Sequence, residues 1–179
     1  MESLLDPASL RGQEGVEFRD ERCVDDREGF DYFASIDGLV AVGITNRAGA
    51  ILLMNSPHGW RVPYGPVDPA ENEDWVAVGR RIGAELTGVD VSISRAERVG
   101  KITHRLEDGF EDGGREGTAR ETTSYDVVLR STPVTGEPVA DDPSFDPWDD
   151  LELEWFDAVP NDAYWDHGDA VDDIRTFLE

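Results

Sequence analysis

The segment between residues 60 and 89 constrains the fold most, because a turn-rich loop there runs directly into the pattern of an amphipathic helix. Three prolines and one glycine fall within seven residues, a composition that favours defined turns: Pro63, Gly65, Pro66 and Pro69. Apolar residues then recur at spacings of three and four, as on one face of a helix: Trp75, Val78, Ile82, Leu86 and Val89. The segment therefore predicts a structured loop followed by one amphipathic helix.

The residues that flank this helix suit its two ends. Asn72 is the predicted N-cap, which places Glu73 and Asp74 in the first turn, where the helix dipole favours negative charge. Gly88 is the predicted C-cap, because glycine adopts the left-handed conformation that often ends a helix.

The loop and the helix together resemble the Nudix box. In that motif a glycine, five residues and a glutamate are followed, seven residues later, by Arg-Glu, an apolar residue, any residue, Glu-Glu, any residue, a glycine and an apolar residue. Gly65 and Glu71 match the first part, and Glu73 lies in the same loop. Arg81 and Glu85, four residues apart, share the polar face of the helix on which the second part falls.

Two registers are open for the second part of the box. In the first, Arg80 and Arg81 stand for the Arg-Glu pair, Ala84 and Glu85 stand for the Glu-Glu pair, and two single-residue insertions are needed. In the second, residues 81–89 align without gaps and the loop gains two residues. We prefer the first register because it keeps the apolar stripe of the helix buried. Both registers retain Glu85 as a glutamate.

The resemblance implies a hydrolase that cleaves the pyrophosphate bond of a nucleoside diphosphate derivative with a divalent metal, Mg²⁺ or Mn²⁺. By resemblance Glu85 and Glu71 would hold the metal, while Arg80 and Arg81 would complete the catalytic helix, with Arg80 positioning a carboxylate or a phosphate. Mg²⁺ prefers hard oxygen ligands. The bound metal would neutralise developing charge and orient the attacking water.

The helix nevertheless lacks most of the other carboxylates of the box. Arg81 adds a positive charge one turn from Glu85, and this charge would repel a metal ion. These departures favour an alternative function, a Nudix fold without catalysis that acts as a nucleotide-binding or protein-binding module.

The acidic composition excludes some partners. The 179 residues include 40 acidic and 16 basic side chains, which give a formal net charge of -24. Without a basic stripe to replace phosphate counterions, nucleic-acid binding is not expected. The charge predicts a halophilic protein that works in a salty cytoplasm, because molar salt shortens the screening length to ~3 Å. Acidity that serves solubility alone is the simpler alternative.

Cys23 is the single cysteine, so no intramolecular disulfide is expected, and the cysteine count predicts no cysteine-based zinc site. No stretch reaches the ~20 apolar residues of a membrane helix, and the N-terminus lacks the pattern of a secretory signal. These features predict a cytoplasmic protein without membrane contact. A homodimer stays open, because the sequence does not fix the oligomeric state.

The order of the remaining elements predicts an α+β fold, with a mixed β-sheet sandwiched between helices. The Nudix fold has the same plan, and the resemblance covers a domain of residues 35–179, after an N-terminal extension of residues 1–34 with a short helix and a strand. The predicted strands are residues 15–24, 33–44, 51–54, 91–93, 99–106, 122–130 and 151–156, with a charged turn at 25–29, a hairpin turn at 46–49, long loops at 107–120 and 133–150, and a last helix at 167–178.

Three basic residues outside the box are candidates for substrate binding: Arg61, His104 and Arg105. For His104 and Arg105 a solvated strand end is the favoured alternative, and for Arg61 the two interpretations are even. The acidic loop at residues 107–121 could supply one more metal ligand, although a solvated loop explains it more simply. Ser124 lacks a Gly-x-Ser-x-Gly setting, so no nucleophile triad is predicted.

The net charge predicts that salt stabilises the fold. Thermal midpoints should rise from dilute buffer to molar potassium chloride, because screening relieves the repulsion among carboxylates. A midpoint that stays flat or falls with added salt would contradict the halophilic interpretation.

Overall fold

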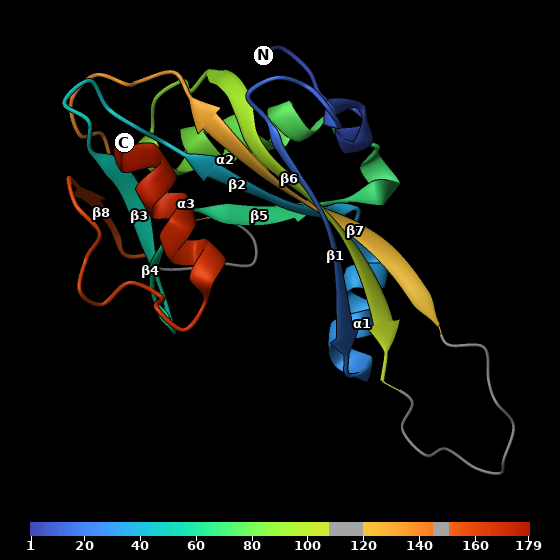
Figure 1. The fold of residues 1–179 in the computed structure, drawn as a ribbon. Coiled ribbons are helices and arrows are strands. Elements are labelled where there is room, and N and C mark those ends of the chain that lie inside the picture. The colour runs from blue at the N-terminus through green and yellow to red at the C-terminus, as the bar shows by residue number, and fades with distance from the viewer. Residues whose placement is uncertain (108–119, 145–150) are drawn as a thin grey trace, which may run out of the picture.

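The computed structural model of the protein describes residues 1–107, 120–144 and 151–179 (Figure 1). These residues form an α+β fold with three α-helices and two β-sheets, as the sequence predicted for the fold class. The elements are η1 (Pro7–Leu10), β1 (Glu17–Asp25), α1 (Arg27–Ser35), β2 (Gly38–Gly43), β3 (Ile51–Ser56), β4 (Gly59–Arg61), β5 (Tyr64–Val67), η2 (Pro69–Glu71), α2 (Trp75–Thr87), β6 (Ile93–Leu106), β7 (Glu121–Ser131), β8 (Leu153–Phe156) and α3 (Gly168–Leu178).

The larger sheet is mixed and has the strand order β1-β6-β7-β2-β5. β1 runs parallel to β6 and β2 parallel to β7, whereas the β6–β7 and β2–β5 pairs are antiparallel. The smaller sheet is antiparallel and has the order β4-β3-β8. The larger sheet is organised around the long β6–β7 pair. Helix α1 covers the far ends of β1, β6 and β7 (Figure 1).

The two faces of the larger sheet carry separate cores. Successive residues of a strand face opposite sides, so Val40 and Val42 pack with α2 while Ala41 packs with α3. Two glycines allow close approach: an added Cβ at Gly79 of α2 would meet Leu129, and one at Gly43 of β2 would meet the Phe177 ring of α3. The helices therefore lie close to the sheet on both faces.

The start of α2 differs from the sequence prediction. Asp74, and not Asn72, is the N-cap, and its carboxylate accepts the backbone N–H groups of Val76 and Ala77. Asn72 instead adopts a left-handed conformation at the end of η2, which asparagine tolerates well. The predicted C-cap at Gly88 is confirmed.

Residues 1–34 pack on the same core as the rest of the chain. Leu4 and Leu10 are buried in the cluster that α2 covers, and Ser3 and Leu4 donate hydrogen bonds to the Asp74 carboxylate. β1 supplies one edge of the larger sheet. The N-terminal segment thus closes the α2 face of the fold.

The prediction between residues 25 and 44 was wrong in its first half. A helix, α1, occupies Arg27–Ser35 where a turn and the start of a strand were expected. Asp26 caps it by accepting the Gly29 N–H, and Phe30 and Phe33 lie three residues apart, which is a helical spacing that the strand prediction overlooked.

The other predicted strands and the last helix are confirmed to within a few residues, except that the predicted strand at 91–93 is only the start of a longer strand: β6 begins at Ile93 and runs without a break through residues 99–106. The predicted hairpin is only local: Thr45 and Ile51 form an isolated bridge, but β2 and β3 belong to different sheets. Most of the acidic loop, residues 108–119, lies outside the described residues. No helix in the described part of the chain is long and apolar enough to cross a membrane.

Candidate functional site

A cavity of about 170 Å³ lies on the face of the larger sheet that α3 covers. It combines aromatic rings with charged groups, and the lining residues that matter here are Phe33, Arg61, Tyr64, Arg98, Ser124, Asp126, Asp169 and Asp173. Alternate residues of β6 and of β7 face the cavity, because successive side chains of a strand point to opposite sides. On α3 the lining residues Asp169 and Asp173 are four positions apart, so they lie on one side of the helix. One side of each element is therefore turned to the cavity.

The buried guanidinium of Arg98 anchors the cavity. Arg98 donates to both carboxylate oxygens of Asp173, over 2.6 and 3.2 Å. The carboxylates of Asp126 and Asp169 each lie 4.0 Å from the same guanidinium. Asp169 is also paired with Arg19 over 3.0 Å, so two guanidinium groups face three carboxylates in this cluster.

Burial changes the protonation of this cluster. Burial raises the pKa of Asp173 to about 7, although Arg98 acts in the opposite direction. Burial also raises the pKa of Asp126, again against the charge of Arg98. Asp126 still keeps 36% of its side-chain surface accessible, because it lies within the fold but faces the cavity. The cluster can therefore bind a proton near neutral pH.

Arg61 lines the cavity and carries a buried hydrogen-bond donor without a partner. Its guanidinium carbon lies 4.0 Å from the centre of the Tyr64 ring and 5.8 Å from that of Tyr164, so the cation rests on aromatic faces. Its Nε is buried and makes no hydrogen bond. An unsatisfied buried donor is costly, and a bound acceptor would remove that cost.

A second polar cluster lies on the same face of the sheet, beneath α1. The His104 Nδ1 lies 2.8 Å from Asp25 Oδ2 and 3.1 Å from Cys23 Sγ, and its Nε2 lies 2.7 Å from Ser124 Oγ. The ring of Phe33 stacks on the imidazole with centroids 4.2 Å apart. His104 is thus a buried, fully bonded residue and not the solvated strand end that was favoured.

The order of hydrogen bonds from Ser124 through His104 to Asp25 is that of a nucleophile triad, which no sequence motif indicated. Only 1% of Ser124 is exposed, so its hydroxyl serves the His104 ring and not an incoming substrate. Burial and the nearby Asp25 raise the pKa of Cys23 to about 11, so this thiol stays protonated at neutral pH and is a weak nucleophile.

The predicted box residues gather on the other face of the sheet, around Arg81. Its guanidinium donates to Glu73 over 2.7 Å. This hydrogen bond and the charges of Glu85 and Glu71 raise the pKa of Arg81. An arginine therefore stands among the carboxylates where the resemblance implies a metal ion.

The other predicted catalytic features have structural partners. Arg80 donates to the backbone carbonyl of Met1 over 3.2 Å, and Gly65 is buried on β5 opposite Val40. Glu85 and Glu71 are exposed. Within the described ranges, the ligand atoms that converge closely enough for a metal ion belong to Cys23, Asp25 and His104, and the box carboxylates form no such group.

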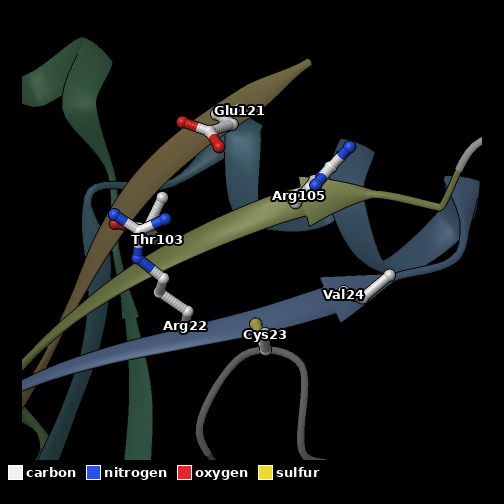
Figure 2. A pocket seen from close by; sticks show the side chains of 6 residues that line it. All are labelled: Arg22, Cys23, Val24, Thr103, Arg105 and Glu121. Atoms are coloured by element: carbon white, nitrogen blue, oxygen red, sulfur yellow. The ribbon is translucent and has the colours of Figure 1, made fainter. Parts of the chain in front are cut away.

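The predicted substrate-binding residues are separated. Arg61 lines the cavity and His104 lies behind it, whereas Arg105 belongs to a surface pocket of about 220 Å³ at the far end of β1, β6 and β7 (Figure 2). His104 and Arg105 are adjacent on β6, so their side chains face opposite sides of the sheet.

Comparison of the chain with known protein families and with curated proteins finds no match. The interpretation of the site therefore rests on its geometry and on the resemblance of the box segment.

The carboxylate cluster predicts a pH dependence of stability. The raised pKa of Asp173 means that the folded chain binds a proton that the unfolded chain, with a carboxyl pKa near ~4, has lost. The free energy of unfolding should therefore fall as pH rises from about 4 through about 7. Asp126→Asn removes one of the three charges, so it should flatten this fall and raise the thermal midpoint at pH 8 by roughly 2–4 °C.

Thermal melts between pH 5 and 8 at constant molar salt would measure the effect. Asp141→Asn, at an exposed residue, is the matched control for the loss of one charge. Equal pH profiles for the wild type and Asp126→Asn would contradict the proton uptake assigned to the cluster.

Proposed function

We propose that the chain is a Nudix-like module that binds a nucleotide derivative in the cavity and does not carry out metal-dependent hydrolysis on α2. Support for the Nudix-like assignment comes from the loop that contains Gly65 and Glu71, from the helix that follows it, and from the mixed sheet between α2 and α3. Support for binding comes from the cavity and, above all, from Arg61.

The unpartnered Nε of Arg61 carries the proposal. A ligand that offers an acceptor at this point would satisfy a buried donor. The guanidinium already lies over the Tyr64 ring, so little side-chain freedom remains to be lost on binding. A planar heterocycle is the ligand part that suits an arginine and aromatic rings together.

The charges indicate which part of the nucleotide enters. Asp126 and Asp169 face the cavity with Arg98 already engaged by Asp173, so a phosphate would meet repulsion there. The same carboxylates accept N–H groups of a base. The cavity of about 170 Å³ is also smaller than the ~300–1,000 Å³ usual for whole small molecules. We therefore assign the base to the cavity and the phosphates to the solvent-facing side.

Arg81 is the reason for excluding hydrolysis on α2 from the proposal. A magnesium ion at the box would have to displace the guanidinium from Glu73, to which it is hydrogen bonded over 2.7 Å. Only one acidic group in reach, Glu85, belongs to the helix itself, and it is exposed. Mg²⁺ binds weakly to so few fixed ligands.

Calorimetry in molar potassium chloride would test the binding. Nucleosides and nucleoside diphosphate derivatives should bind the wild type with and without magnesium, and Arg61→Gln should weaken binding at least tenfold, a loss of about 1.4 kcal/mol. Arg47→Gln, at an exposed arginine in the turn after β2, is the matched control and should bind as the wild type does.

Circular dichroism would show that Arg61→Gln remains folded. The proposal fails if no nucleoside derivative binds, if Arg61→Gln binds equally well, or if the wild type releases phosphate or nucleoside monophosphate when magnesium is added.

A metal-dependent pyrophosphohydrolase is the second candidate function, and the gathering of Glu71, Glu73 and Glu85 around Arg81 favours it. Arg81→Glu removes the central positive charge and adds a carboxylate, so it should raise the affinity for Mg²⁺ or Mn²⁺ at least tenfold in calorimetry. Glu85→Gln in that background should lower the affinity again. Unchanged metal affinity in Arg81→Glu would show that the helix face is not a metal site in either register.

A further inference from the structure

Three different metal-ligating side chains converge at the edge of the larger sheet. Cys23 and Asp25 are two residues apart on β1, so they share one face, and His104 lies directly opposite Cys23 in the parallel register of β1 and β6. Their ligand atoms all lie within 4.8 Å of one another. Strand register, and not a flexible loop, fixes this arrangement.

The distances suit a small tetrahedral ion after a minor expansion. The three atoms form a triangle with sides of 2.8 Å (Asp25 to His104), 3.1 Å (Cys23 to His104) and 3.2 Å (Cys23 to Asp25). Around a zinc ion with bonds of ~2.0–2.3 Å, such atoms would lie about 3.3–3.6 Å apart. Each pair therefore needs to separate by only a few tenths of an ångström.

We propose that Cys23, Asp25 and His104 form a binding site for Zn²⁺ or a chemically similar divalent transition metal, with water as the fourth ligand. The mixed sulfur, nitrogen and oxygen donors select this class of ion over Mg²⁺, which prefers oxygen alone. On binding, the ion displaces the proton of the Cys23 thiol to solvent. The resulting thiolate and the Asp25 carboxylate balance the two positive charges of the ion, so the filled site is neutral. The site is independent of the function proposed for the cavity.

The surroundings of His104 hold its ring as a metal ligand requires. Ser124 Oγ lies 2.7 Å from Nε2, where it can accept the N–H of that nitrogen and leave Nδ1 free to bind the ion. Phe33 stacks on the ring from α1 and restricts its rotation. Ser124 is thus a positioning residue: its buried hydroxyl orients the His104 ring for metal binding and does not act as a nucleophile.

The site is reachable from outside. β1 is an edge strand of the sheet, Asp25 keeps 18% of its side chain exposed, and Cys23 is itself only partly buried. An ion can therefore enter without the chain unfolding.

Cobalt titration of the metal-free full-length protein in molar potassium chloride tests the proposal. Co²⁺ bound to a thiolate gives a charge-transfer band, and because the chain has a single cysteine, this band reports only this site among the many carboxylates. We expect the band to saturate at one ion per chain, to disappear on addition of Zn²⁺, and to persist with excess Mg²⁺.

Four variants sharpen the test. Cys23→Ser should lose the band, Asp25→Asn should weaken Co²⁺ binding at least tenfold, and Ser124→Ala should weaken it roughly tenfold through the orientation of His104. His58→Gln, at an exposed histidine outside the cluster, should bind as the wild type does. Far-UV circular dichroism would identify any variant that fails to fold.

A thermal midpoint that rises with Zn²⁺ in the wild type and not in Cys23→Ser would support the site independently of the cobalt band. The proposal is overturned if the wild type gives no thiolate–cobalt band, or if Asp25→Asn, folded as judged by circular dichroism, binds Co²⁺ with unchanged affinity.

Discussion

The buried ion pair between Arg98 of β6 and Asp173 of α3 is the interaction on which the α3 side of the fold depends. It ties the last helix to the central sheet through two hydrogen bonds, and the cavity lies beside it. Removing one member of a buried pair leaves an uncompensated charge, which typically costs ~3–5 kcal/mol. Here the cost would be increased for the loss of Arg98, because Asp126 would also lose a nearby positive charge, whereas Asp169 would keep its ion pair with Arg19.

The same electrostatic arrangement recurs on the other face of the sheet. Arg81 stands among Glu73, Glu71 and Glu85 as Arg98 stands among its three aspartates. Because the chain has 40 acidic and only 16 basic residues, one arginine can interact with several carboxylates at once. The two sites differ in burial: Arg81 is exposed, so its pairing is weak and screened by salt, whereas the pairing of Arg98 is sheltered from both water and salt.

The two proposed sites lie next to each other on one face. Ser124 lies at the end of the cavity and contacts His104 of the Cys23–Asp25–His104 cluster, and Phe33 borders both. Alternation along β7 accounts for this, because Ser124 and Asp126 are two residues apart and face the same side. Ser124 and Phe33 therefore border both the cluster and the cavity.

Local patterns were sufficient for much of the fold. The apolar stripe of α2, its C-cap at Gly88, the strand β7 and the helix α3 follow from periodicity and turn chemistry over a few residues. Where two local signals competed, the prediction failed. Asn72 and Asp74 are both good caps, and the contacts of Ser3 and Leu4, at least seventy residues away in sequence, accompany the choice of Asp74. The helical spacing of Phe30 and Phe33 was overlooked because the apolar run that follows them favoured a strand from residue 33.

The sequence by itself determined the α+β class and the acidic composition, because composition and periodicity are properties of neighbouring residues. Only the tertiary structure decided the functional groups. The cysteine count argued against a zinc site, since it could not show that β1 and β6 pair in register and bring Asp25 and His104 to Cys23. Likewise, the pairing of Arg98 with Asp173 joins residues 75 apart in the chain. Sheet register and helix docking bring such residues together, and neither can be recognised from a short stretch of sequence.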